Sequence, residues 1–194
     1  MTVVVWFKRD LRIFDHASLH AAAQQGKPVL PLYVVEPNYW QQPDASRRHW
    51  HFIYDSLQAL DKALEALGQP LVVRVGDIEA VLTALKAQHQ VSMMYSHEEP
   101  GNAWVCARNA RVAAWCQAQQ VSWHELPSNG VVRQLRSRDE WSATHRQRMR
   151  APLVTPPTCL MPVKDIAKGH LPAKTDALFG ATRIGQVQPG GRAD

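Results

Sequence analysis

The chain has 194 residues, enough for one domain and a tail, and its 45% hydrophobic and 20% charged residues are ordinary for a globular protein. No apolar run approaches the ~18 residues that span a bilayer, and the first charges follow the first apolar stretch, the reverse of a signal peptide. With three cysteines and no C-x-x-C spacing, the composition predicts a cytoplasmic protein with no membrane partner.

Short apolar runs rich in β-branched residues alternate with segments of helical periodicity. Strands buried on both faces are predicted, in chain order, at residues 3–7, 29–36, 71–75, 91–95 and 121–126. Helices are predicted between them at residues 16–25, 50–67, 78–88 and 103–119. Asp15 is expected to cap the first helix, and residues 37–46, rich in turn formers, are expected to form a loop.

This alternation predicts an α/β fold: a Rossmann-like, doubly wound parallel sheet of five strands in the order 3-2-1-4-5. The pattern stops at about Leu126. Residues 151–194 contain six of the 13 prolines and five of the ten glycines, which is the composition of an extended linker.

Most of the positive charge lies between Pro127 and Arg150. Six arginines and two acidic residues give this segment +4 of the formal net charge of +5; the arginines are Arg133, Arg136, Arg138, Arg146, Arg148 and Arg150. Guanidinium groups can bind phosphate. The same cluster can also be a solvated helix face or one half of a contact between domains.

Two polar loops, residues 8–12 and 96–102, follow the first and fourth strands, which are neighbours in this strand order. Ligands of open parallel sheets bind beyond the strand ends where the order reverses, so the two loops are expected to face each other across a crevice. Arg9 and Asp10 would form one lip, and Glu98 and Glu99 the other. In the alternative, Arg9 pairs with Asp10 and the glutamates are surface charges before a helix.

Neither a metal site nor a catalytic centre is predicted. The histidines His49 and His51 do not have the spacing of metal ligands. The chain contains no G-x-G-x-x-G, no phosphate-binding G-x-x-x-x-G-K-[ST] and no G-x-S-x-G motif. The motifs alone therefore indicate a binding domain.

The first strand and its loop carry a longer signature. Residues 5–16, VWFKRDLRIFDH, resemble the opening motif of the photolyase/cryptochrome family, W-F-R-x-D-L-R-x-x-D-N/H. The likeness continues through residues 31–40, 46–67 and 75–77.

The resemblance implies a domain organisation. A Rossmann-like photolyase α/β domain is expected at residues 1–129, followed at residues 130–194 by a basic helical segment and a Pro/Gly-rich interdomain linker. The FAD-binding helical domain of the family is expected to be missing from this sequence. The fragment alone is therefore expected to catalyse nothing.

The resemblance also implies a function. Such a domain holds an antenna chromophore, methenyltetrahydrofolate or a deazaflavin, and the helical domain binds FAD and damaged DNA. The parent protein would be a light-dependent DNA photolyase, a carbon–carbon lyase that repairs pyrimidine dimers. The implied antenna contacts are Arg9, Asp10, Glu36, Pro37, Ser46, Arg47, His49, Glu98, Glu99 and Asn102.

Two other functions stay open on the sequence. A cryptochrome blue-light photoreceptor would have the same architecture. A stand-alone nucleotide-binding or partner-binding module could use the same sheet, although the chain has no phosphate-binding glycine loop.

Overall fold

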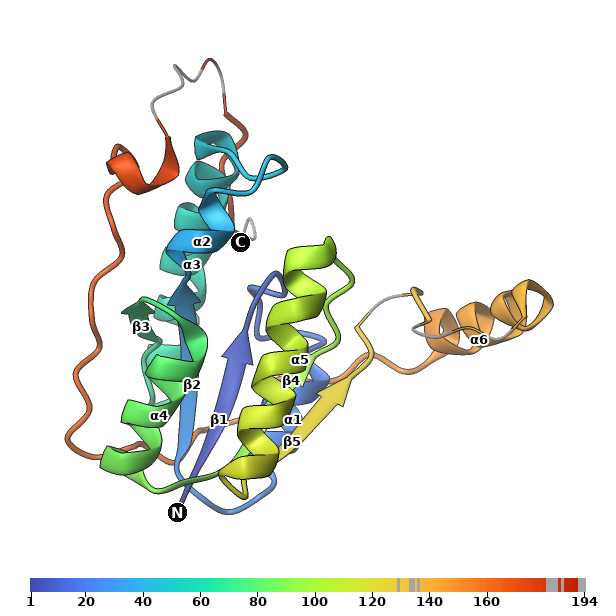
Figure 1. Ribbon diagram of the computed structural model, residues 1–194. Coiled ribbons are helices and arrows are strands. Elements are labelled where there is room, and N and C mark those ends of the chain that lie inside the picture. The colour runs from blue at the N-terminus through green and yellow to red at the C-terminus, as the bar shows by residue number, and fades with distance from the viewer. Residues whose placement is uncertain (129, 133–134, 136, 181–184, 186, 192–194) are drawn as a thin grey trace.

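A computed structural model of the chain describes residues 1–128, 130–132, 135, 137–180, 185 and 187–191. Its centre is a five-stranded parallel sheet in the order β3-β2-β1-β4-β5 (Figure 1). The predicted fold class and strand order are therefore confirmed. The strands are β1 (Thr2–Phe7), β2 (Val29–Val35), β3 (Val72–Val75), β4 (Val91–His97) and β5 (Ser122–Leu126).

Helices connect the strands as the sequence predicts, with one addition. The helices are α1 (Ala17–Ala23), α2 (Pro37–Trp40), α3 (Arg47–Ala66), α4 (Ile78–His89), α5 (Ala103–Ala118), α6 (Arg138–Arg150) and the short 3-10 helix η1 (Ala177–Phe179). The single turn α2 lies in the segment expected to be a loop, and Pro37 occupies its first turn, where a missing N–H costs no hydrogen bond.

The expected cap of α1 is wrong by one residue. His16 caps the helix, because its Nδ1 accepts a hydrogen bond from Leu19 N over 3.0 Å. Asp15 instead has a positive φ of 49°, and its carboxylate accepts a hydrogen bond from Val154 N over 3.1 Å. Asp15 thus anchors a distant segment instead of the helix.

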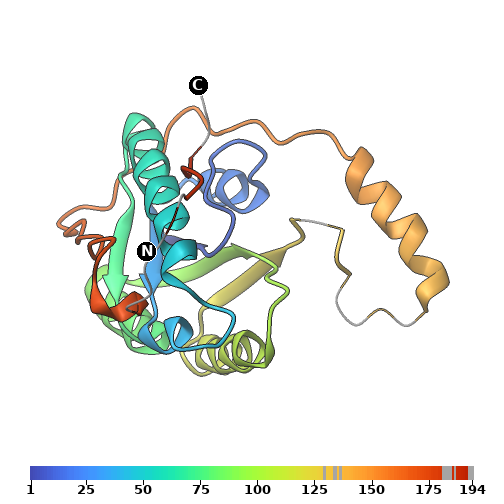
Figure 2. The ribbon, with the colours of Figure 1, turned by 90° about the horizontal axis from the view of Figure 1, so that it is seen from above.

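The sheet is covered on both faces, and Figure 2 shows its helices in two layers. Alternate β1 side chains point to opposite faces: Val3, Val5 and Phe7 pack in one buried cluster with α1 and α3. Val4 and Trp6 pack in the other with α4 and α5. Burial on both faces explains why the strands are continuously apolar.

The segment after α6 packs against the domain. We call residues 151–180 the strap, because Figure 1 shows this segment passing along the β3 edge of the sheet and up beside α3. Its Lys168 carbonyl accepts from Val73 N over 2.7 Å, so it covers backbone groups of an edge strand. The contact is so close that a Cβ on Gly169, which has a φ of +79°, would lie 2.1 Å from the Val73 carbonyl oxygen.

No helix among the described residues is long and apolar enough to cross a membrane. The domain boundary expected at Asn129 and two of the six arginines, Arg133 and Arg136, lie outside the residues that the structure describes.

Candidate functional site

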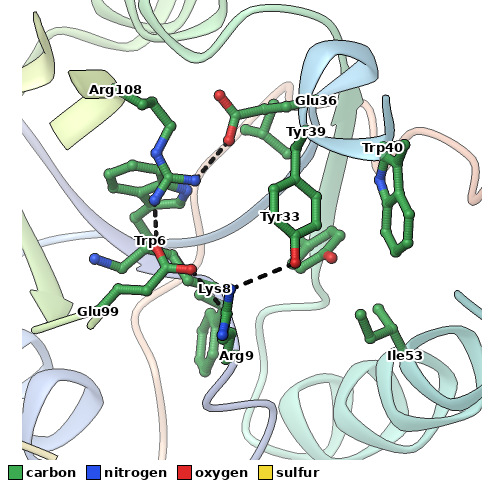
Figure 3. Close-up of a pocket in the computed structure, with 12 residues that line it drawn as sticks. Trp6, Lys8, Arg9, Tyr33, Glu36, Tyr39, Trp40, Ile53, Glu99 and Arg108 are labelled. Carbon is green, nitrogen blue, oxygen red and sulfur yellow. Dashed lines mark hydrogen bonds and ion pairs between the residues drawn. The ribbon is translucent and has the colours of Figure 1, made fainter. Parts of the chain in front are cut away.

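A crevice opens at the carboxyl ends of β1, β2 and β4, at the point where the strand order reverses (Figure 3). Aromatic rings and charged side chains form its walls together. The residues that line it are Trp6, Phe7, Lys8, Arg9, Tyr33, Val34, Glu36, Tyr39, Trp40, Ile53, Glu99 and Arg108. The place is the one that the strand order predicts for a ligand.

An ion-pair network crosses the crevice, with Arg108 at its centre. Arg108 Nη1 donates to Glu36 Oε2 over 2.8 Å, and Arg108 Nη2 donates to Glu99. Glu99 Oε1 also accepts from Arg9 Nε over 3.1 Å, so the two polar loops are joined as expected. Burial alone would lower the pKa of Arg108, but Glu99 and Glu36 raise it, and the guanidinium stays charged.

Two polar side-chain atoms of the crevice make no hydrogen bond to the described residues. Within the described part of the chain, Lys8 Nζ and Glu36 Oε1 are buried and have no hydrogen-bond partner. Lys8 Nζ lies 3.6 Å from Glu125 and 4.8 Å from the centre of the Trp6 ring. Burial lowers the pKa of Lys8, and burial raises the pKa of Glu36 to about 7 in spite of Arg108. A buried donor and a buried acceptor without hydrogen bonds are costly unless a ligand or water satisfies them.

The space that remains between these side chains is small. The cavity volume is about 40 Å³, whereas pockets for small molecules occupy roughly 300–1,000 Å³. Arg9 is the side chain on the outer rim, since 52% of it is exposed. Its second contact, from Nη2 to the Tyr39 hydroxyl, is a long 3.5 Å. Arg9 can therefore leave the rim at a lower cost than the buried Arg108.

Asp10 does not line this crevice but points into the protein. Its Oδ1 accepts from Lys8 N over 2.9 Å, and its Oδ2 lies 2.7 Å from His97 Nδ1 and 2.8 Å from His16 Nε2. Burial alone would raise the pKa of Asp10, but His16 and His97 lower it well below its usual value. Asp10 thus joins the β1 loop to the end of β4 and to the start of α1.

Asp10, His16 and His97 are also the one group among the described residues with the spacing of metal ligands. The hydrogen bond from Leu19 N to His16 Nδ1 decides against a metal. A neutral imidazole that accepts at Nδ1 carries its proton at Nε2, so His16 has no lone pair to offer a metal there. The geometry is that of a hydrogen-bonded cluster.

Three of the ten implied antenna contacts line the crevice: Arg9, Glu36 and Glu99. Of the others, Pro37 begins α2, and Glu98 lies 3.9 Å from Arg148 of α6. Neither reaches the crevice lining. Their role as antenna contacts stays a prediction.

The remaining implied contacts lie at helix starts. Asn102 caps α5 and donates through Nδ2 to the Asp44 carboxylate over 2.9 Å. Ser46 caps α3, and Arg47 donates to the carbonyl oxygen of Asp176 in the strap over 3.2 Å, while His49 is exposed. These residues lie outside the crevice lining, and no described contact joins them to it.

Sequence reasoning placed Lys8 in a loop expected at the crevice but missed eight other residues of its lining, of which Arg108 is the most important. A signal was available, because Val105, Arg108, Val112 and Cys116 recur at spacings of three and four. An arginine on the buried face of a helix needs a carboxylate partner. The aromatic residues Trp6, Tyr33 and Trp40 were indistinguishable from core residues in the sequence.

Comparison with known proteins gives a family match. The sequence matches the family model for DNA photolyase over residues 3–154. It is 40% identical over 83 residues to a deoxyribodipyrimidine photo-lyase of Agrobacterium fabrum, and this alignment covers 43% of this chain and 17% of that protein. It is 33% identical over 103 residues to a cryptochrome DASH of Synechocystis sp., and this alignment covers 50% of this chain and 21% of that protein.

A solved structure has the same fold. An archaeal photolyase from Sulfolobus tokodaii, described with two FAD molecules and the implication of a novel light-harvesting cofactor, superimposes with a TM-score of 0.65 at 21% identity. The superposition covers 84% of this chain and 38% of that one. The alignments span about a fifth of the two curated relatives.

Proposed function

This chain belongs to the DNA photolyase family, as an N-terminal α/β domain of the photolyase/cryptochrome type, and on that premise we propose that its crevice binds a light-harvesting antenna chromophore. The intact protein would be a deoxyribodipyrimidine photolyase that uses light to repair pyrimidine dimers. Its partners would be an FAD-binding domain of the same protein and, through that domain, damaged DNA. A cytoplasmic location is part of the same proposal.

The observation that carries the proposal is the pair of unsatisfied groups in an aromatic-walled crevice. Lys8 Nζ offers a donor, and Glu36 Oε1 offers an acceptor. A planar heterocycle with carbonyl and N–H groups, such as a deazaflavin or a pterin, offers an acceptor for the first and a donor for the second. The rings of Trp6, Tyr33 and Trp40 then supply apolar contacts for its faces.

The donor set fits such a chromophore, but the cavity of about 40 Å³ does not hold one without a movement. Arg9 is the group best placed to move, since it is half exposed and its contact with the Tyr39 hydroxyl is weak. Binding would replace the Arg9–Tyr39 contact. Arg108 would stay in place between Glu36 and Glu99, because moving it would break two buried ion pairs.

When bound, the chromophore would absorb near-ultraviolet or blue light. The residues of this chain would hold the ring, orient it and exclude water from it. The archaeal photolyase supports this proposal, since its structure holds two FAD molecules and implies a light-harvesting cofactor. We favour a deazaflavin in the crevice over a folate bound at Ser46–His49. Arg47 would have to contact such a folate, but its guanidinium already donates hydrogen bonds to carbonyl groups of the strap.

Titration of the chain with a deazaflavin, followed by fluorescence anisotropy, tests the proposal. Lys8→Gln and Glu36→Gln should each weaken binding about tenfold or more, because each removes a hydrogen bond to a charged group. The matched controls Lys62→Gln and Glu65→Gln, at exposed positions of α3, should leave it unchanged. Absence of binding by the natural chain, or equal effects of both sets, would contradict the proposal.

A cryptochrome photoreceptor is the second candidate, because the chain is similar to proteins of both names. The two differ in whether the whole protein repairs DNA. We expect a protein made of this domain and an FAD domain to split pyrimidine dimers under blue light and not in darkness. Light absorption without loss of dimers would favour the cryptochrome.

A further inference from the structure

Helix α6 differs from the other helices of the fold in having no buried residue. Figures 1 and 2 both show it standing away from the body of the domain. One side of the helix attaches it: Trp141 Nε1 donates to the Gly130 carbonyl over 3.2 Å, and Arg148 Nη1 donates to the Val131 carbonyl over 2.7 Å. Arg148 also lies 3.9 Å from Glu98.

The opposite side carries two arginines. Arg146 and Arg150 are four residues apart and therefore share a face of the helix. Together with Ala143 and Gln147 they border a shallow hollow of about 300 Å³. We call these four residues the outer face of α6.

The two arginines of the outer face are not neutralised within the described structure. Arg146 donates only a long hydrogen bond of 3.4 Å to Ser142 Oγ, and neither guanidinium has an ion pair with a described carboxylate. The nearest acid along this face, Asp139, is seven residues before Arg146 and so ~10 Å away. Arg111 of α5, in contrast, is paired with Glu79.

Interactions within the fold explain only in part why two arginines lie together on the outer face of α6. A positive charge in the last turn of a helix interacts well with the helix dipole, but two like charges four residues apart repel each other. The outer face also contains no apolar side chain larger than Ala143. A protein partner would be expected to find an apolar anchor at the centre of its contact, and this face offers none.

We propose that the outer face of α6 contacts the phosphate backbone of duplex DNA. Guanidinium groups bind phosphate oxygens through paired N–H donors, and Gln147 supplies a further donor. Such contacts are independent of base sequence. This surface is separate from the crevice, and it gives the α/β domain a contact with DNA of its own.

Fluorescence anisotropy with a labelled, undamaged duplex tests the proposal on the chain as it is. Affinity should fall steeply with salt, and the double variant R146Q/R150Q should weaken binding about tenfold or more at low salt. Its slope of log affinity against log salt should be shallower by about 2, because each lost phosphate contact removes about 0.9. The matched control K62Q/K164Q changes the net charge equally at exposed positions elsewhere.

Two further measurements complete the test. Circular dichroism should show unchanged helix content in R146Q/R150Q, because the outer face makes no contact with the domain core. Competition by poly-L-glutamate should be much weaker than competition by unlabelled duplex. The proposal is overturned if the chain does not bind DNA, if both double variants weaken binding equally, or if poly-L-glutamate competes as well as DNA.

Discussion

At the scale of single residues, Arg108 decides whether the crevice is stable. Its guanidinium is buried and lies between two buried carboxylates, Glu36 and Glu99. It also packs 4.8 Å from the centre of the Trp6 ring. The residue therefore joins α5 to the ends of β2 and β4 and shapes the floor on which a ligand would rest.

Replacing Arg108 with glutamine should destabilise the protein strongly. Glu36 and Glu99 would lose the cation buried between them, and breaking a buried ion pair in this way costs about 3–5 kcal/mol. Urea denaturation measures the free energy of unfolding. The control Arg111→Gln removes an ion pair in which nearly half of the arginine is exposed, and should cost less than about 1 kcal/mol. Equal losses of unfolding free energy in the two variants would show that the ion pairs of Arg108 do not stabilise the fold more than those of an exposed arginine.

The cluster of Asp10, His16 and His97 should make stability depend on pH. Burial lowers the pKa of His16, with Asp10 acting in the opposite direction. Histidine in the unfolded chain has a pKa of about 6.5. Below that pH, His16 binds a proton in the unfolded chain but stays neutral in the folded one, so unfolding becomes more favourable as the pH falls. The depressed pKa of Asp10 adds a second loss at lower pH, below about 3.9.

His16→Asn tests this account, because asparagine can cap α1 and donate to Asp10 without titrating. The free energy of unfolding of this variant should fall less between pH 7 and pH 5 than that of the natural chain. His49→Asn, at an exposed site, should leave the slope unchanged. If both variants keep the natural slope, His16 is not responsible for it.

Some of these residues could be predicted from the sequence and others could not. The strand order was enough to bring Arg9 and Glu99 together, because it makes β1 and β4 neighbours. It could not tell which way Asp10 points, since that depends on its contacts with His97 at the end of β4 and with His16 at the start of α1. Side-chain direction in a loop follows from tertiary contacts that no local pattern encodes.

At the scale of elements, the strap is the part of the fold that composition described least well. Its proline and glycine content correctly indicates an extended segment, yet Leu160, Val163 and Phe179 are buried. Phe179 stacks on Trp50 with ring centres 4.1 Å apart and meets Trp40 edge-on at 4.9 Å. Isolated apolar residues in a segment without periodicity give no sign of burial, because their partners lie on distant elements, as Trp40 of α2 and Trp50 of α3 do for Phe179.

Phe179→Ala should therefore destabilise the protein by about 3–5 kcal/mol, the usual cost of emptying a buried aromatic site. The near-ultraviolet circular dichroism of Trp40 and Trp50 should change with it, since both rings lose their neighbour. Leu153→Ala is the control, because that side chain is 66% exposed. A loss below about 1 kcal/mol for Phe179→Ala would mean that the strap is not packed as described.

At the scale of the whole molecule, the strap closes one side of the sheet. The carbonyl of Lys168 takes the Val73 N–H, and Arg74 donates to the Ala167 carbonyl over 2.9 Å. Without these contacts β3 would present an open edge, and open edges pair with other chains. The sheet, helices α1 to α5 and the strap thus form one folded unit.

A chain that stops at Arg150 should self-associate. Removing the strap uncovers the β3 edge and the apolar surface around Trp50, and both favour contact between copies. Size-exclusion chromatography with light scattering should give species larger than a monomer, increasing with concentration. A stable monomer equal in unfolding free energy to the longer chain would contradict this role of the strap.

An absorption spectrum shows whether the crevice holds an antenna chromophore. The chain would be incubated with a deazaflavin, passed through a gel-filtration column and measured in the near-ultraviolet and visible range. We expect one chromophore to be retained per chain, with its absorption band shifted from that of the free compound, and retention to be lost in Lys8→Gln. A chain that leaves the column with no absorption beyond that of its own aromatic residues would contradict this expectation.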